Sequence, residues 1–181
     1  QSTFVQSISS SGEGLLSIIN DILDFSKAES GTVELTEVVF SPADTLTQVS
    51  QLLRPLSEKK GLEVRLELAN DLPPAVLGYS GRLRQCLLNV AGNAVKFTFE
   101  GSVTLRARRH GIGQIEFEIQ DTGIGIPAPK LATIFSAFEQ VDNELTRNFE
   151  GTGLGLAISK QLVNLMGGTI VVASKEEVVT V

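Results

Sequence analysis

The amino-acid sequence predicts an α/β protein, in which a long amphipathic helix precedes a domain that mixes strands and helices. Apolar residues near the N-terminus recur at alternating spacings of three and four, interrupted only at Ser11, which is typical of a helix that packs in a bundle. Three later segments alternate apolar and polar residues, as half-buried strands do. Helical segments lie between the strands, and two consecutive strands form a hairpin instead of a repeated parallel unit.

Composition excludes several classes of protein. The chain has 181 residues, and 15 basic against 21 acidic residues give a net charge of −6, so no basic groove for nucleic acid is expected. Hydrophobic residues make up 42% of the chain, which is enough for a core and argues against disorder. The single cysteine, Cys86, excludes an intrachain disulfide and a zinc cluster, and it favours a reducing, cytoplasmic location.

The ends of the sequence indicate a part of a longer protein. It starts without Met and ends inside the apolar run Val178–Val181. No apolar run approaches the roughly 18 residues that a membrane helix needs, so any membrane attachment is expected only through segments outside this sequence.

The first helix is expected over Phe4–Phe25. Its apolar residues form one row of Ile8, Leu15, Ile18, Ile22 and Phe25, and a second row of Leu16, Ile19 and Leu23. Two adjacent rows require more than one neighbouring helix to cover them. The polar, glycine-terminated segment Lys27–Gly31 ends the helix, and we place a domain boundary there, between residues 1–30 and 31–181.

The later elements follow from periodicity and from capping residues. Ser41 and Pro42 predict the start of a helix that Gly61 ends, and residues 110–113 predict a hairpin turn. The expected strands are Val33–Phe40, Leu62–Leu68, Ser102–Arg109, Gln114–Gln120 and Thr169–Ser174. The other expected helices are Ala43–Lys60, Ser80–Phe97, Pro127–Phe135 and Gly153–Met166, whereas Ser136–Glu150 shows no period.

The helix Ser80–Phe97 carries a stripe of polar residues on one face. Its members follow one another at spacings of three, four, four and three, and they are Arg82, Gln85, Asn89, Asn93 and Lys96. Asparagine is unfavourable inside a helix relative to alanine, so amides and an ammonium turned toward a cleft would suit a ligand that bears oxygens. A solvated helix face is an equally good interpretation of the stripe taken alone.

Two glycine motifs flank the unpatterned segment. Asp121 follows a strand and precedes Gly123 and Gly125, so it could accept a hydrogen bond from a buried amino group, although a tight turn would explain the same run. Gly151-Thr152-Gly153-Leu154-Gly155 opens a helix and would expose backbone N–H groups at the positive end of the helix dipole, as a phosphate site does. Neither the Walker pattern nor the GxGxxG pattern is present.

Taken in order, these motifs resemble a known family. LNVAGNAVKFT (Leu88–Thr98), DTGIGI (Asp121–Ile126), FSAFEQ (Phe135–Gln140) and GTGLGL (Gly151–Leu156) resemble the N, G1, F and G2 boxes of the histidine-kinase catalytic domain, in the GHKL ATPase superfamily. LLSIINDILDFSKAESG (Leu15–Gly31) resembles the second dimerisation helix and linker of hybrid sensor kinases. The resemblance covers nearly the whole chain. It implies an α+β two-layer sandwich, with a mixed sheet and helices on one face, preceded by a long bundle helix.

The resemblance also implies a role for each matching residue. Asn93 would ligate Mg²⁺ through its side-chain oxygen, with Asn89 one turn earlier and Lys96 facing the phosphates of ATP. Asp121 would accept from the adenine amino group, and Phe97 would lie along the adenine ring. Ser136–Glu150 would form the ATP lid, anchored by Phe135 and Phe138. The other implied nucleotide contacts are Gly123, Gly125, Ile126, Arg147, Gly151, Thr152, Gly153, Leu154 and Gly155.

The implied function is that of the ATP-binding catalytic domain of a hybrid sensor histidine kinase. Such a domain delivers the γ-phosphoryl of Mg·ATP to a histidine, for relay to an aspartate of a receiver domain in cis or in trans. The acceptor segment, HExxxP-like in this family, has no match here, and the sole histidine, His110, lies in the hairpin turn. We therefore expect no catalytic residue in this sequence and a homodimer formed through the N-terminal helix.

Two alternative functions stay open. A GHKL ATPase of the chaperone, topoisomerase or mismatch-repair kind uses a glutamate base in the amide-bearing helix, and no acidic residue lies between Arg82 and Thr98. A nucleotide-binding pseudokinase that acts as a dimeric interaction module would carry the same nucleotide motifs.

Overall fold

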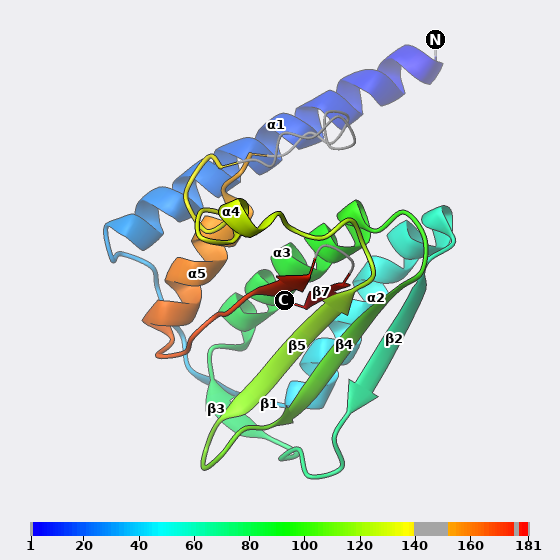
Figure 1. Cartoon of the computed structure of the whole chain (residues 1–181). Helices are drawn as coiled ribbons and strands as arrows, with labels where there is room; N and C mark the ends of the chain where they lie inside the picture. The colour runs from blue at the N-terminus through cyan, green and yellow to red at the C-terminus, as the bar shows by residue number, and fades with distance from the viewer. Residues whose placement is uncertain (1, 140–151, 176–177, 181) are drawn as a thin grey trace.

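A two-layer α+β sandwich follows one long helix in the computed structural model, which describes residues 2–139, 152–175 and 178–180 (Figure 1). The mixed sheet forms one layer and helices cover one of its faces. The predicted fold class is confirmed, including the long preceding helix.

Helix α1 spans Ser2–Glu29, and its N-terminal half projects beyond the sandwich (Figure 1). Its C-terminal part packs against α5 (Gly155–Leu165). The residues of its two apolar rows that the structure describes upstream of Phe25 are 43–61% exposed: Leu15, Leu16, Ile18, Ile19, Ile22 and Leu23. In this single chain, the apolar side chains of α1 between Leu15 and Leu23 are therefore largely uncovered.

The main sheet has the strand order β2-β4-β5-β7-β6. Strand β2 (Glu63–Leu68) runs parallel to β4 (Ser102–Arg109), whereas β5 (Ile115–Asp121), β7 (Val178–Thr180) and β6 (Ala173–Lys175) continue the sheet with antiparallel pairs. The register pairs Val103 with Asp121, which brings the end of β5 beside the start of β4. A separate antiparallel pair joins β1 (Val38–Phe40) and β3 (Val76–Gly78).

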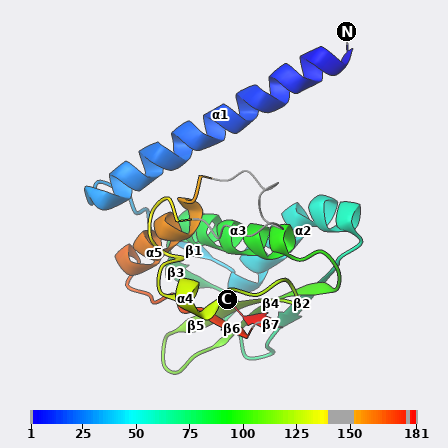
Figure 2. The same ribbon diagram turned by 45° about the horizontal axis from the view of Figure 1, so that its top comes forward.

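Helices α2 (Pro42–Lys60) and α3 (Ser80–Phe97) pack on the inner face of the sheet, and α5 lies beside α3 (Figure 2). The predicted cap of α2 is confirmed, because the Ser41 hydroxyl accepts from the Asp44 N–H at 3.1 Å. Gly61 ends α2 in the left-handed conformation that C-terminal glycines adopt.

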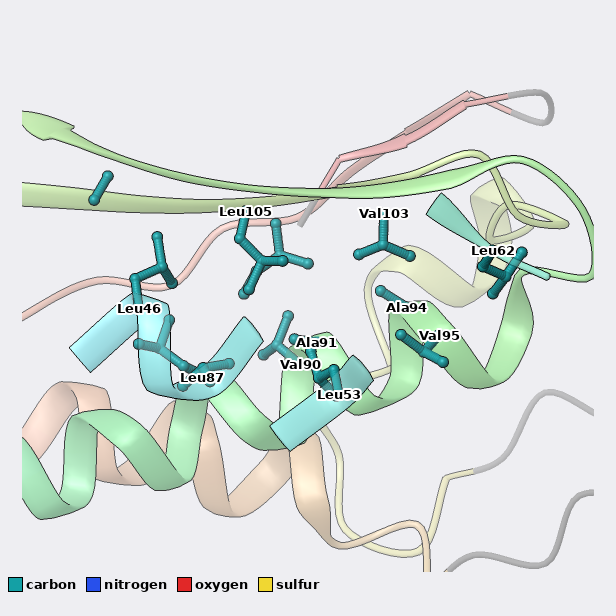
Figure 3. Close-up of a cluster of buried hydrophobic side chains, with 13 residues drawn as sticks. Leu46, Leu53, Leu62, Leu87, Val90, Ala91, Ala94, Val95, Val103 and Leu105 are labelled. Atoms are coloured by element: carbon teal, nitrogen blue, oxygen red, sulfur yellow. The ribbon is translucent and has the colours of Figure 1, made fainter. Parts of the chain in front are cut away.

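The main core lies between α2, α3 and the sheet (Figure 3). Strand β4 shows the alternation that the sequence predicts: Val103, Leu105 and Ala107 point into the core and are almost fully buried. Arg106 and Arg108 point to the other face, where they form ion pairs with acidic residues of neighbouring strands. This alternation determines which face of the sheet receives the helices.

Several predicted elements differ in extent from those observed. The predicted strand Val33–Phe40 forms only three strand residues, and its partner β3 was not predicted. The predicted helix Pro127–Phe135 is the single turn α4 (Ala128–Leu131), because the backbone continues in turns from Lys130 to Ser136. The strand expected at Thr169–Ser174 begins later, as β6. Short strands form only where another strand lies close enough to pair with them. The periodicity of the local sequence does not predict that neighbour.

Candidate functional site

The predicted site residues gather around the C-terminal half of α3. The loop 121–126, which begins at the last residue of β5, contacts the end of α3 through a hydrogen bond from the Ile124 N–H to the Phe97 carbonyl, at 3.3 Å. The N-terminus of α5 contacts the middle of α3, where the Asn89 side-chain amide donates to the Gly155 carbonyl at 3.2 Å. The two glycine motifs therefore meet on the amide-bearing helix.

Gly123 fits against α3 with no room for a side chain. A Cβ at this position would lie 2.6 Å from the Phe97 carbonyl oxygen and 2.8 Å from an Asp121 carboxylate oxygen, closer than real Cβ atoms approach. The Gly123 N–H donates to Asp121 Oδ1 at 2.8 Å, which holds the carboxylate against the loop. Gly125 follows with a φ of 72°.

Asp121 is a buried carboxylate with part of its hydrogen-bonding capacity unused. Its exposed fraction is 4%, and burial raises its pKa to about 6, although the Gly123 N–H acts in the opposite direction. The carboxylate is mostly ionised at neutral pH and then accepts hydrogen bonds only. No donor in the part of the chain that the structure describes binds Asp121 Oδ2.

The N-terminal part of the polar stripe of α3 contacts two neighbouring helices. Gln85 donates to Asp24 of α1 at 2.7 Å, and Arg82 lies 3.9 Å from the same carboxylate. Asn89 binds α5, through the Gly155 carbonyl and the Ser159 hydroxyl. The N-terminal part of the stripe thus holds the helices together instead of facing a ligand.

Asn93 and Lys96 form the remaining part of the stripe. Within the described ranges, the Asn93 side-chain amide makes no hydrogen bond. Burial lowers the pKa of Lys96, and its Nζ lies 5.1 Å from the centre of the Phe97 ring. An amide and an ammonium at this position can both bind an anionic or metal-bound ligand.

The motif at the start of α5 is shaped by close backbone contacts. Gly153 has a φ of 68°, and a Cβ there would lie 3.0 Å from backbone atoms of Phe138 and Glu139. Its carbonyl accepts from the Phe138 N–H at 3.0 Å. The Thr152 hydroxyl accepts from the Leu154 N–H at 3.2 Å and donates to Asp21 of α1 at 3.0 Å. Helix α1 therefore contacts the predicted phosphate motif directly.

Phe138 is turned toward α1. It adopts a φ of 63°, which is unusual for a residue with a side chain, and its side chain is 68% exposed. Its ring meets the ring of Phe25 edge to face, with 6.4 Å between the ring centres. The Ile126 N–H, by contrast, is tied to the Ser174 hydroxyl at 2.8 Å. Arg147, Gly151 and most of the predicted lid lie outside the described residues.

Sequence reasoning missed Lys60, which binds the end of α3. Its Nζ donates to the carbonyls of Val95, Lys96 and Thr98 at 2.8, 2.6 and 3.1 Å. A basic residue in the last turn of a helix is normally assigned to the dipole of its own helix. Ser159 and Asp21 were missed for a similar reason, because the local sequence pattern does not predict that they bind Asn89 and Thr152.

A surface hollow of about 260 Å³ lies away from these residues. It is lined by the first turns of α2 and α3, including Ser41, Asp44, Ser80 and Arg84, and by none of the predicted site residues. Among the described residues, no group of three or more His, Cys, Asp or Glu side chains could hold a metal ion.

Residues 78–181 match the family described as "Histidine kinase-, DNA gyrase B-, and HSP90-like ATPase". This range covers more than half of the chain and includes every predicted site residue. The chain belongs to this ATPase family. Its relatives identify the branch as the catalytic domain of histidine kinases, which confirms the resemblance drawn from the four boxes.

Three proteins illustrate this relationship. The "Signal transduction histidine-protein kinase BarA" of Escherichia coli (strain K12) is 43% identical over 174 residues, which cover 94% of this chain and 19% of BarA. The "Hybrid signal transduction histidine kinase B" of Dictyostelium discoideum is 37% identical, over 97% of this chain and 9% of that protein. The crystal structure of full-length ShkA in complex with AMPPNP has a TM-score of 0.89 at 38% identity, over 99% of this chain and 37% of that one.

The chain thus spans only about a fifth of the length of BarA. No helix within the described ranges has both the length and the hydropathy that are needed to cross a membrane.

Proposed function

We propose that this chain is the Mg·ATP-binding catalytic part of a hybrid sensor histidine kinase, with the nucleotide held between α3, the loop 121–126 and the start of α5. The observation that carries the proposal is the pairing of Asp121 with Gly123. A buried carboxylate, one oxygen of which no donor among the described residues binds, stands beside a glycine that lets the loop close on the end of α3. This arrangement suits a flat base that carries an amino group, as adenine does.

Asp121 is assigned to the adenine amino group, and Phe97, which adjoins the same loop, to the face of the base. Gly123, Gly125 and Ile126 form the backbone of this end of the site. Guanine presents a carbonyl where adenine presents the amino group, so an ionised Asp121 would face a second acceptor. The site is therefore expected to prefer adenine nucleotides.

Asn93 is assigned to Mg²⁺ and Lys96 to the phosphates, with Asn89 fixing α5 against α3. Mg²⁺ keeps most of its waters and takes its other ligands from phosphate oxygens, so one amide oxygen suffices as the protein ligand. Asn93 fits this role, because its side-chain amide makes no hydrogen bond to the residues that the structure describes. The bound ion would neutralise charge on the phosphates of ATP.

The phosphate end is assigned to the N–H groups of Gly151, Gly153, Leu154 and Gly155, with Thr152, Phe138 and Arg147 beside them. Consecutive N–H groups at a helix N-terminus attract anions. In the described structure the Leu154 N–H is bound by Thr152, so a phosphate would compete with that hydroxyl.

The activity of the whole protein is proposed from the same assignment. The domain would hold the γ-phosphoryl of ATP toward a histidine outside this sequence, and a receiver aspartate would take it next. Residues 1–30 would belong to the dimerisation domain and residues 31–181 to the catalytic domain, on the cytoplasmic side of any membrane. The exposed apolar side chains of α1 between Leu15 and Leu23 support pairing with further helices, including those of a second copy.

The test is direct binding of Mg·ATP by the purified chain. We expect binding that Asn93→Ala weakens and that Asn164→Ala, at an exposed position of α5, leaves unchanged. Incubation with γ-labelled ATP should leave the protein unlabelled and the ATP intact, because the sole histidine, His110, lies in the β4–β5 hairpin and α3 carries no acidic residue between Arg82 and Thr98. Failure of the unmodified chain to bind Mg·ATP would refute the proposal, and steady hydrolysis would favour the chaperone or topoisomerase branch of the superfamily.

A further inference from the structure

The last carbonyl groups of α3 all have partners, although a helix normally leaves its final four without one. The Ala94 carbonyl accepts from both the N–H and the hydroxyl of Thr98, at 3.1 and 2.7 Å. The Phe97 carbonyl accepts from the Ile124 N–H in the loop after β5. The remaining carbonyls are those bound by Lys60, and they belong to Val95, Lys96 and Thr98.

Lys60 is well placed for this contact. It is the last residue of α2, and Gly61 turns the chain immediately after it. An ammonium group has three N–H donors, and here it meets three carbonyl oxygens within 3.1 Å. Partial burial lowers its pKa, but the charge is placed favourably at the negative end of the α3 dipole.

Lys60 binds the end of α3, from Val95 to Thr98, and the loop 121–126 packs against this same segment. Phe97 and Thr98 supply the carbonyl and hydroxyl oxygens that Gly123 packs against, and no slack exists for a Cβ between them. Thr98 is fully buried, so it has little freedom to move independently. A displacement of this segment would therefore change the position of Gly123 and, through its N–H, of Asp121.

We infer that Lys60 is a positioning residue for the base-binding end of the nucleotide site, acting through the carbonyl groups of Val95, Lys96 and Thr98. The inference rests on the proposed function, since it assumes that adenine binds at Asp121. Lys60 lies 36 residues before Lys96 in the sequence and needs no contact with the nucleotide for this role.

The test compares Lys60→Met with Lys59→Met, which removes the same charge from the exposed neighbouring residue. The dissociation constants of Mg·ATP and Mg·GTP are measured for each variant, well below its unfolding temperature. For Lys60→Met we expect ATP affinity to fall about tenfold, equivalent to about 1.4 kcal/mol, with a smaller fall for GTP. The ratio of the two affinities should therefore decrease, whereas Lys59→Met should keep the values of the unmodified chain.

Lys60→Arg provides a second variant in case Lys60→Met does not fold. It keeps the charge, but the planar guanidinium cannot place its donors toward three carbonyls that surround a single nitrogen. The ratio of ATP affinity to GTP affinity is therefore expected to lie between those of Lys60→Met and the unmodified chain. Asn93→Ala is the reference for damage at the metal, since it should weaken ATP and GTP equally and preserve their ratio.

A lower unfolding temperature with an unchanged ATP-to-GTP ratio would overturn the inference, because Lys60 would then be a helix cap only. Unchanged affinities in a folded Lys60 variant would overturn it too. Failure of the unmodified chain to bind Mg·ATP is a different result, and it would remove the proposed function itself.

Discussion

The two ends of the proposed nucleotide site are built in different ways. At the base-binding end, Asp121, Gly123 and Thr98 are held by backbone hydrogen bonds and by the buried end of α3, all within residues 31–181. At the phosphate end, some of the partners come from α1. Asp21 binds Thr152, and Phe25 meets the exposed ring of Phe138.

The difference indicates that the phosphate end depends on the position of α1 and that the base-binding end does not. The base-binding end belongs to a sandwich whose core is complete without α1. The phosphate end adjoins a smaller cluster in which Leu154 and Ile158 of the α5 region pack with Phe25 of α1. A movement of α1 should therefore alter phosphate contacts and leave the recognition of adenine intact.

The largest expected effect concerns the base-binding end. Asp121→Asn replaces an acceptor-only carboxylate with an amide that can also donate to the carbonyl of guanine. A polar site of this kind discriminates by up to roughly 10⁴-fold, and we expect the variant to lose most of the preference for ATP over GTP. Titration of both nucleotides checks this, and an unchanged preference would reduce Asp121 to a turn residue.

Asp121 should also make binding and stability depend on pH. Its folded pKa of about 6 lies above the ordinary value of 3.8, so its contribution to the free energy of unfolding is fully present below about 3.8 and is lost as pH rises through about 6. ATP affinity should change in the opposite sense and weaken as pH falls through about 6. Unfolding and binding measured between pH 4 and pH 8, about two units either side of that pKa, should both lose this dependence in Asp121→Asn.

Replacing either of two glycines with alanine should change the free energy of unfolding in opposite directions, because one glycine is closely packed and the other is not. Gly123→Ala forces a Cβ against a backbone carbonyl, and overpacking of this kind costs about 1–3 kcal/mol of unfolding free energy. Gly92→Ala is the control, because a Cβ there meets nothing within 4 Å and alanine favours a helix by about 1 kcal/mol. Chemical denaturation should give opposite signs for the two variants. Equal signs would contradict the packing assigned to Gly123.

A smaller effect is expected at the phosphate end. Asp21→Ala removes a carboxylate from the phosphate motif and releases the Thr152 hydroxyl proton for a phosphate oxygen. Asp21 is only partly buried, and a charge interaction of about 0.2–1 kcal/mol there corresponds to a gain of up to about fivefold in ATP affinity. Calorimetric titration beside Glu29→Ala, an exposed change on the same helix, tests this. A loss of affinity would mean that Asp21 supports the motif instead of competing at it.

The smallest effect on the nucleotide site is expected from the outer surface of α1. Replacing Ile18 and Ile22 with Glu should convert a concentration-dependent dimer into a monomer, because both side chains are exposed and apolar. Nucleotide affinity should not change. Sedimentation at increasing concentration measures the first effect, and a monomeric unmodified chain would reject the proposed role of this surface.

The sequence alone determined the elements whose signals are local. The bounds of α3 match the prediction, the hairpin between β4 and β5 lies where glycines flank its turn, and Ser41 caps α2. Periodicity and capping act within a few residues, so they can be read without knowing the fold. The order of the glycine and amide motifs likewise identified the family.

Only the tertiary structure decided which partners these elements found. It paired β1 with β3, bound Gln85 and Asn89 of α3 to α1 and α5, and placed the ammonium of Lys60 against the end of α3. A lysine or an amide in a sequence shows how many hydrogen bonds it can make, but not with which distant atoms. Those choices depend on how the buried faces of separate elements pack together, and packing brings together residues that local patterns cannot connect.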